Sequence, residues 1–158
     1  MTGGAPKFIA DCMLGKLARG LRVLGYDAAY EHRISDVDLI RKARGDGRIL
    51  LTRDTRLVQR RALPPHLLIS SERPAAQIRQ TIEAFDLKID QGRLLTRCLL
   101  CNAGTEAIAR DLVKGKVPPH VFDTQSRFAR CPKCRRIYWR ATHVKGILDW
   151  IDEAAGPR

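Results

Sequence analysis

Four of the five cysteines form two C-x-x-C pairs, and this spacing restricts the fold more than any other feature. The pairs are Cys98 with Cys101 and Cys131 with Cys134. Each pair bends the backbone so that both sulfurs face one point, and two pairs provide the four thiolates of a tetrahedral Zn²⁺ site. The alternatives are a redox motif, which normally occurs once and opens a helix, or unrelated buried cysteines. We predict structural zinc bound by all four cysteines, with no open coordination position for catalysis.

The chain around these pairs predicts a small zinc ribbon. The 29 residues between Cys101 and Cys131 exceed the usual spacing of a ribbon, so a helix or long loop is inserted there. A short helix is expected over 105–112 and an outgoing strand over 137–139. The remaining cysteine, Cys12, is expected to be a small buried residue.

The first half of the sequence alternates short apolar runs with helical patterns. Leucines recur at helical spacing between Leu14 and Leu24, and Gly25 ends that pattern. The expected strands are 8–10, 27–31, 48–52 and 66–69, and the expected helices are 14–24, 35–45, 57–58 and 74–85. This order predicts an α/β fold with a parallel sheet flanked by helices, followed by the zinc ribbon and a C-terminal helix.

A chain of 158 residues has room for one ordinary domain and a small satellite. We assign 1–92 to the α/β domain, 93–141 to the zinc ribbon, and 142–158 to a C-terminal helix and tail that pack back on the α/β domain. Residues 1–92 hold 16 basic and 11 acidic side chains, a net charge of +5, and the rest hold 13 and 6, a net charge of +7. A ribbon this small depends on its metal for folding.

The whole chain carries a formal net charge of +12. A surplus of this size favours a polyanionic partner, and nucleic acid is the first candidate. Charge alone does not separate RNA from DNA, anionic lipid or a ribosomal surface. No apolar run reaches the roughly 18 residues of a membrane span, which excludes a transmembrane protein. The segment 1–7 lacks the layout of a signal peptide, so we expect a cytoplasmic protein.

Four aspartates fall where the predicted strands end or a helix begins. Asp11 follows the first strand, Asp54 follows the third, and Asp36 and Asp38 open the helix between the second and third. Ligands bind beyond the carboxyl ends of parallel strands, so these side chains could converge there. Converging carboxylates repel each other unless a cation such as Mg²⁺ or Mn²⁺ neutralises them. The alternative is that these residues only cap helices and turns.

Several motifs occur together in an order that resembles one protein family. They are FIADCMLGKLAR at 8–19, LRVLGYD at 21–27, ILLTRD at 49–54, the two C-x-x-C pairs, and YWRATH at 138–143. Over about residues 8–150 the chain is similar to the Mut-seven C-terminal RNase family, a PIN-like nuclease fold that carries a zinc ribbon. The family more often has Gly where Ala141 stands.

The resemblance implies a metal-dependent ribonuclease whose first domain is PIN-like. Such nucleases gather three or four acidic residues around Mg²⁺ or Mn²⁺. Asp11 matches the acid after the first strand, Asp54 matches the acid of the Thr-Arg-Asp segment, and Asp36 and Asp38 match an acidic pair before a helix. Asp38 stands where Glu is common, and its shorter side chain could loosen the contact with metal. Glu72 is the nearest candidate for a further acid.

Basic residues near these acids and on the ribbon are candidates for contact with RNA phosphates. Lys16 and Arg19 lie close enough to Asp11 in sequence to hold the scissile phosphate. Aromatic residues interleave with the basic residues of the ribbon, which favours stacking on bases, although some of these rings belong to its core. Arg22 could equally lie on a solvated helix face. The full set of candidates is Lys16, Arg19, Arg22, Arg53, Arg130, Lys133, Arg135 and Arg136.

The leading hypothesis is an endoribonuclease that hydrolyses RNA phosphodiester bonds, with tRNA or ribosomal RNA as candidate substrates. Its catalytic residues would be Asp11, Asp36, Asp38 and Asp54, and its cofactors structural Zn²⁺ and catalytic Mg²⁺ or Mn²⁺. In the first alternative the chain binds RNA or the ribosome without chemistry. In the second it is the toxin of a toxin–antitoxin pair. A homodimer or a complex with a protein inhibitor is also open.

Overall fold

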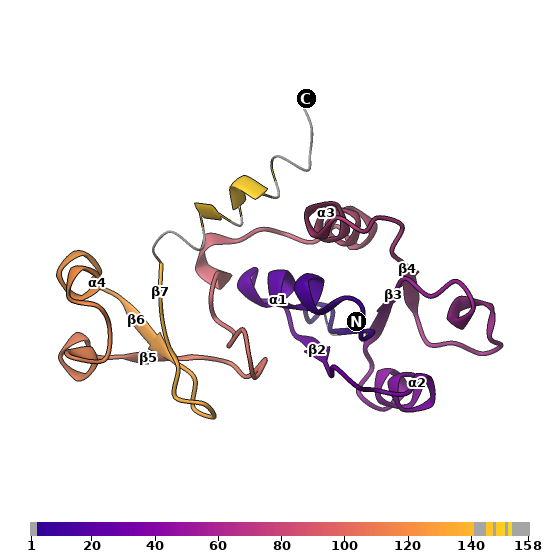
Figure 1. Ribbon diagram of the computed structural model, residues 1–158, viewed down its shortest axis with the longest axis horizontal. Helices are drawn as coiled ribbons and strands as arrows, with labels where there is room; N and C mark the ends of the chain where they lie inside the picture. Colours follow the sequence, from indigo (N-terminus) through magenta and orange to yellow (C-terminus); the bar gives the residue numbers. More distant parts are fainter. Residues whose placement is uncertain (1–2, 141–144, 147, 151, 153–158) are drawn as a thin grey trace.

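The computed structural model describes residues 3–140, 145–146, 148–150 and 152. Its first part is a parallel four-stranded sheet in the order β2-β1-β3-β4 (Figure 1). The elements of this part are β1 (Phe8–Ala10), α1 (Gly15–Val23), β2 (Ala28–Tyr30), α2 (Asp36–Gly45), β3 (Ile49–Thr52), the 3-10 helix η1 (Leu57–Gln59), β4 (His66–Leu68) and α3 (Pro74–Phe85). The predicted α/β architecture is confirmed.

The two faces of this sheet carry different helices. Successive side chains of a strand point to opposite faces, so Phe8 and Ala10 join the larger core with α1 and α3. Ile9 and Leu50 belong to a second, smaller core, which they share with buried residues of α2. Figure 1 shows α2 on the side of the sheet away from α1 and α3. The carboxyl ends of the strands therefore form one open edge between the two helical layers.

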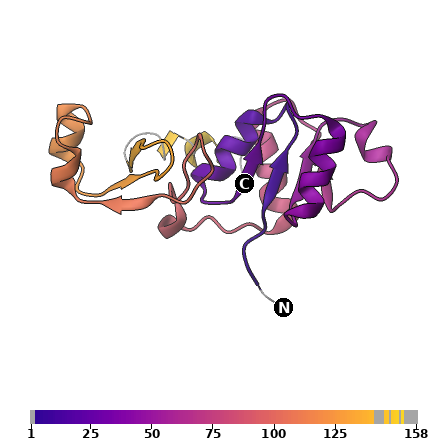
Figure 2. The same ribbon diagram turned by 90° about the horizontal axis from the view of Figure 1, so that it is seen from below.

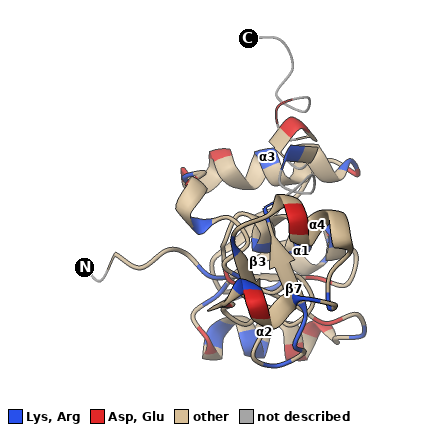
Figure 3. Cartoon of the chain, turned by 90° about the vertical axis from the view of Figure 1, so that its left-hand side faces the viewer, with Lys and Arg blue, Asp and Glu red and all other residues tan. Residues whose placement is uncertain are grey.

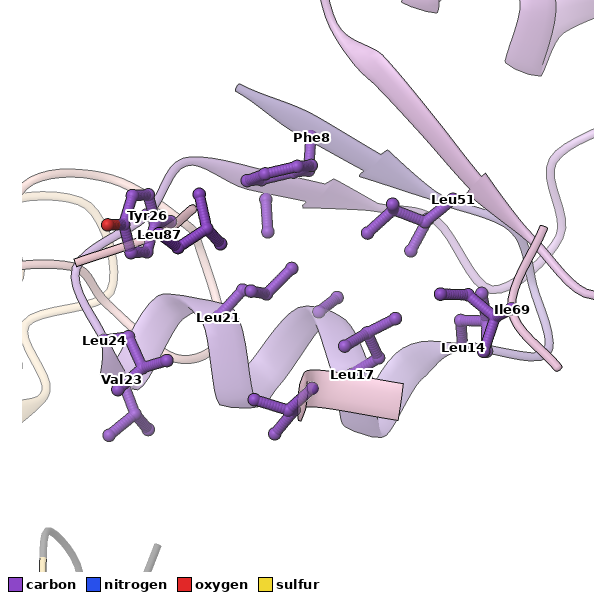
Figure 4. Close-up of a cluster of buried hydrophobic side chains, with 14 of the residues drawn as sticks. Phe8, Leu14, Leu17, Leu21, Val23, Leu24, Tyr26, Leu51, Ile69 and Leu87 are labelled. Atoms are coloured by element: carbon purple, nitrogen blue, oxygen red, sulfur yellow. The ribbon is translucent and has the colours of Figure 1, made fainter. Parts of the chain in front are cut away.

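Helix α1 supplies much of the larger core. Leu14, Leu17 and Leu21 recur at helical spacing and are completely buried beneath the sheet (Figure 4). Burial of each such side chain contributes about 1.5–3 kcal/mol. The helix is followed by Gly25 with φ +85°, a left-handed conformation in which glycine commonly ends a helix.

The second part of the chain is an antiparallel three-stranded sheet in the order β5-β6-β7. Figure 2 shows this sheet beside the first part, so that the described chain is elongated. Its elements, with the turn that precedes them, are the 3-10 helix η2 (Gln91–Arg93), β5 (Glu106–Ile108), the 3-10 helix η3 (Arg110–Val113), α4 (Pro119–Thr124), β6 (Phe128–Arg130) and β7 (Ile137–Trp139).

The helix expected over 105–112 is wrong. Strand β5 occupies part of this segment and pairs with β6, with Ala107 opposite Ala129, and η3 follows. The hydrogen bonds to β6 replace those of a helix, so tertiary pairing overrides the local preference. The helix inserted between the two cysteine pairs is instead α4, which begins at Pro119, a residue suited to a first helical turn.

Polar contacts join the first cysteine pair to α1 and β2. Arg22 is only 6% exposed, and its Nη1 donates to the Leu99 carbonyl at 2.8 Å. The carboxylate of Asp27 accepts from Arg48 Nη1 at 2.5 Å and from Asn102 Nδ2 at 2.6 Å. Because Leu99 and Asn102 flank Cys101, these bonds fix the cysteine pair against the α/β part.

The chain end returns to the first part. Residues 145–146, 148–150 and 152 are helical, and Leu148 and Trp150 pack against the larger core. The remainder of the expected C-terminal helix and tail, at 142–144, 147, 151 and 153–158, lies outside the described residues. Within the described part of the chain, no helix has the length and apolar character needed to span a bilayer.

Candidate active site and zinc site

The four predicted zinc ligands lie together. The sulfur atoms of Cys98, Cys101, Cys131 and Cys134 are all within 4.8 Å of one another, and the sulfurs of Cys98 and Cys134 are 3.6 Å apart. Sulfurs around a tetrahedral Zn²⁺ with bonds of about 2.3 Å are separated by about 3.8 Å. The donor set therefore fits zinc, and it has the four thiols of a closed structural site.

A tyrosine supports this cluster from β7. The hydroxyl of Tyr138 lies 3.1 Å from the Cys98 sulfur, and the backbone N–H of Leu99 donates to the same hydroxyl at 3.1 Å. When Cys98 is ionised its sulfur can only accept, so the Tyr138 hydroxyl then donates to it. Partners of this kind orient metal ligands and are part of the site.

The protonation of the cysteines shows why the cluster needs a cation. Burial raises the pKa of Cys98, but hydrogen bonds from Tyr138 and from backbone N–H groups outweigh burial and lower the pKa to about 6. Hydrogen bonding with Cys134, partial burial and the neighbouring Cys98 thiolate raise the pKa of Cys101 to about 12. Neighbouring thiols resist sharing negative charge, so ionisation of all four requires a bound cation.

Asp11 lies at the carboxyl edge of the parallel sheet, immediately after β1. It is 6% exposed, and its carboxylate accepts three hydrogen bonds. Met13 N donates to Oδ1 at 2.9 Å, while the Thr52 hydroxyl and Arg53 N donate to Oδ2 at 2.5 and 3.0 Å. Oδ1 and Oδ2 together have about four lone-pair positions, so one position remains for a further partner.

Asp54 lies next to Asp11 through the same threonine. The Thr52 hydroxyl accepts from Asp54 N at 3.0 Å while donating to Asp11, so one hydroxyl links the two aspartates. Asp54 Oδ1 caps η1 by accepting from Arg56 N and Leu57 N at 2.8 and 3.2 Å. The other oxygen of this carboxylate, Oδ2, accepts no hydrogen bond from the described residues.

Asp36 and Asp38 lie at the start of α2, and both are engaged with arginines. Asp36 Oδ2 accepts from Arg60 at 2.9 Å. Asp38 Oδ1 accepts from Arg41 at 2.8 Å, and its Oδ2 accepts from the Ser35 hydroxyl in a helix-capping arrangement. Asp36 retains one oxygen without a described partner, whereas both oxygens of Asp38 are used.

The acidic edge is therefore formed by Asp11 and Asp54, with Asp36 at the neighbouring helix start. Thr52 bonds the carboxylate of Asp11 and the backbone N–H of Asp54. Among the described residues, the only group of three or more metal-binding side chains within 4.8 Å is the cysteine cluster. Mg²⁺ is commonly held by one or two carboxylates while it keeps several waters. Asp11 and Asp54 supply hard oxygen donors of that kind, so the donor set fits Mg²⁺ or Mn²⁺.

The basic candidates near this edge differ in their surroundings. Lys16 and Arg19 on α1 are exposed and make no hydrogen bond or ion pair with the described residues. Arg53 pairs with Glu72 at 3.3 Å, and its Nε is buried with no hydrogen-bond partner in the described structure. A buried donor left unpaired costs about 1–3 kcal/mol. If the Arg53 side chain rotated toward a bound anion, this N–H would gain a partner and the anion would be stabilised.

The structure contradicts the expectation that Arg22 contacts RNA or lies on a solvated helix face. It is buried, and its guanidinium donates to the carbonyls of Ala28, Leu99 and Leu100. Helical spacing placed it on the same stripe as Lys16 and Arg19, but the ribbon covers that end of α1. Cys12 is likewise exposed and not buried.

The ribbon candidates divide between surface and core. Lys133, Arg135 and Arg136 are exposed and Arg130 is half-buried. The aromatic rings are mostly core: Phe128 and Tyr138 are buried, and the Trp139 ring packs edge-on against Phe128. Arg136 and Arg19, which are remote in sequence, line one cavity of about 400 Å³ between α1 and β7. Figure 3 shows Lys and Arg spread over both parts of the chain.

Sequence reasoning missed two residues of these sites. Thr52 links the two aspartates. The sequence feature that could have indicated this role is a hydroxyl at the last position of a buried strand, two residues before Asp54. Tyr138 was considered only as a stacking or core residue. No sequence signal indicated that its hydroxyl reaches Cys98, because that contact spans 40 residues.

Comparison with known proteins gives one match. The model of a family described as "Mut7-C RNAse domain" matches residues 6–151. No curated protein and no solved structure matches the chain.

Proposed function

Because the chain belongs to the Mut7-C RNase domain family, we propose that it is an endoribonuclease dependent on Mg²⁺ or Mn²⁺. The observation that carries the proposal is the linkage of Asp11 to Asp54 through the Thr52 hydroxyl at the open edge of the sheet. The Asp11 carboxylate is buried, and no arginine side chain of the described residues pairs with it. A buried carboxylate without such a partner is costly, and a divalent ion would offset that cost.

Asp11 and Asp54 would hold the ion, with Asp36 as an additional ligand after its bond to Arg60 opens. When bound, such an ion polarises the phosphate and offsets the negative charge that develops on its oxygens. Asp11 is already positioned by three hydrogen bonds, so little freedom is lost on binding. Asp54 would contribute Oδ2, since Oδ1 serves as the cap of η1.

Cationic side chains beside this edge would orient the RNA phosphate. Lys16 lies in the first turn of α1, five residues after Asp11, and makes no hydrogen bond or ion pair with the described residues. Arg53 directly precedes Asp54, and its guanidinium has an unsatisfied Nε. A guanidinium can bind two phosphate oxygens at once. The exposed arginines of the ribbon would bind the strand outside the cleavage point.

Substitution of Asp54 is the sharpest test. Asparagine retains a side-chain oxygen for the cap of η1, whereas the charge and one oxygen are lost. We expect Asp54→Asn to reduce cleavage of a labelled single-stranded RNA, in Mg²⁺ or Mn²⁺, by at least about 100-fold. Asp11→Asn is less suitable because its new NH₂ group would face hydrogen-bond donors and weaken folding.

The matched control is Asp86→Asn. Asp86 is exposed, pairs with Lys88, and has φ +47°, which asparagine tolerates. It should cleave as the wild type does, and all three proteins should contain the same amount of zinc. Wild-type cleavage rates in Asp54→Asn would refute the proposed site.

A second function is favoured by the arginine partners of Asp36 and Asp38. Carboxylates paired with arginine do not need a metal, and a protein that only binds RNA would have no use for one. Strong RNA binding by the wild type without cleavage, in either Mg²⁺ or Mn²⁺, would support this binding function over the nuclease.

A further inference from the structure

A groove lies between α2 and the segment that follows η1. It has a volume of about 420 Å³, and no acidic residue lines it. The lining residues are Val37, Ile40, Arg41 and Arg44 from α2 and Arg60 and Arg61 from the following segment. We call it the arginine groove.

The helix presents to this groove a regular stripe that is separate from its core face. Positions 37, 40, 41 and 44 follow the i, i+3, i+4, i+7 spacing of one helix face. The core face of α2 is formed by Leu39 and Ala43, which are buried. Of the stripe, only Ile40 packs partly against the smaller core, whereas the side chains of Val37, Arg41 and Arg44 are exposed.

The groove has an excess of positive charge. Four guanidinium groups line it, and two of them are paired, Arg41 with Asp38 and Arg60 with Asp36. Arg44 donates to a backbone carbonyl, which leaves its charge uncompensated, and Arg61 makes no hydrogen bond or ion pair with the described residues. Two of the four positive charges therefore have no acidic partner, and such a concentration of like charge attracts a polyanion.

The arginine groove adjoins the acidic edge. Asp54 caps η1 at its first turn, and Arg60 immediately follows the end of that 3-10 helix. Arg60 in turn reaches Asp36 at the start of α2. A strand lying across Asp11 and Asp54 can therefore continue into the groove without crossing the ribbon.

We propose that the arginine groove binds the phosphate backbone of the RNA strand on the side of the acidic edge opposite the ribbon. This inference rests on the proposed function for its substrate, but not on cleavage. The exposed side chain of Val37 and the half-buried Ile40 offer an apolar surface between the cations, which suits the sugar and base portions of a flexible single strand.

The test is binding of a labelled single-stranded RNA in buffer without added Mg²⁺ or Mn²⁺, with zinc content verified. The variant Arg44→Ala/Arg61→Ala removes the two uncompensated charges and leaves the acidic edge and the ribbon unchanged. The matched control is Lys7→Ala/Lys88→Ala, which removes the same charge at the amino end of the sheet, away from the acidic edge.

Each phosphate contact to a single strand contributes a slope of about −0.7 to the logarithm of affinity against the logarithm of salt. The groove variant should therefore lose on the order of 20-fold in affinity near 0.1 M salt, and its slope should be shallower by about 1.4. The control should keep most of the affinity and the wild-type slope.

Equal losses in the groove variant and the control would overturn the inference, because only net charge would then matter. Unchanged binding in the groove variant would also overturn it. Wild-type cleavage in Asp54→Asn would refute the proposed nuclease site without affecting the binding measured for the groove, so the two proposals fail separately. Urea unfolding of the groove variant itself checks that any loss is not due to unfolding, because this variant lacks the bond from Arg44 to the Ala62 carbonyl. Arg61→Ala by itself removes no described bond and should also weaken RNA binding.

Discussion

Arg22 on α1 donates from Nη1 to the backbone carbonyl of Leu99, 77 residues further along the chain, at 2.8 Å. The same nitrogen reaches the Leu100 carbonyl at 3.3 Å. Burial lowers the pKa of Arg22, although an arginine remains protonated in proteins. One buried cation thus connects the α/β part to the zinc site, and its loss would leave carbonyls in the junction without a donor.

Arg22→Met should destabilise the protein by about 2–4 kcal/mol, because it removes charge-assisted bonds and leaves buried carbonyls unsatisfied. Urea unfolding measures the free energy directly. Arg19→Met on the exposed side of the same helix is the control, and it should change the free energy of unfolding by less than about 0.5 kcal/mol. Equal effects of the two substitutions would show that Arg22 does not stabilise the junction.

Tyr138→Phe should weaken zinc binding by about 10–100-fold, because it removes the hydroxyl that bonds the Cys98 sulfur. Competition with a chromophoric chelator gives the affinity. Tyr30→Phe, which loses bonds to the Cys12 carbonyl and to His32 Nδ1 but none to the cysteine cluster, should bind zinc as the wild type does. Removal of zinc from the wild type should unfold the ribbon strands, with loss of strand signal in circular dichroism.

Acid should destabilise the protein partly through Asp27. Burial alone would raise the pKa of Asp27, but the hydrogen bonds and charges of its partners outweigh burial and lower it. A carboxylate with a depressed pKa contributes stability above its unfolded pKa of about 3.9, and this contribution is lost as the pH falls through the folded value. The free energy of unfolding of Asp27→Asn should therefore fall less than that of the wild type below about pH 4.

The control for this pH series is Asp86→Asn, which removes an exposed carboxylate and should keep the wild-type dependence. A pH dependence of Asp27→Asn equal to that of the wild type would contradict the role given to the contacts of Asp27 with Arg48 and Asn102.

Gly25→Ala should destabilise the protein strongly. Its φ is +85°, and an added Cβ would lie 2.3 Å from the backbone carbonyl oxygen of Arg93. Strain in the left-handed region costs about 1–2 kcal/mol, and the clash with backbone adds to it. Gly45→Ala, where a Cβ meets nothing within 4 Å, should be neutral or stabilise slightly. Thermal unfolding measures both effects, and equal melting temperatures for the two variants would contradict the role given to Gly25.

Local sequence signals were sufficient to predict most of the architecture. Leucine spacing along α1, the apolar centre of β3 and the Ser35 cap of α2 are local signals, and they predicted the order of the parallel sheet elements correctly. The two C-x-x-C pairs predicted the zinc ligands because the geometry of each pair depends only on neighbouring residues. The helix expected over 105–112 failed where a local preference competed with pairing to a distant strand.

Which polar side chains meet depends on tertiary packing and could not be predicted from local patterns. Arg22, Thr52 and Tyr138 each act through a partner far away in sequence, at separations of 77, 41 and 40 residues. The same holds for the pairing of Asp36 with Arg60, which the helix-start pattern could not reveal. Hydrogen bonds and ion pairs depend on separations of a few ångströms, and periodicity fixes only the face on which a residue lies.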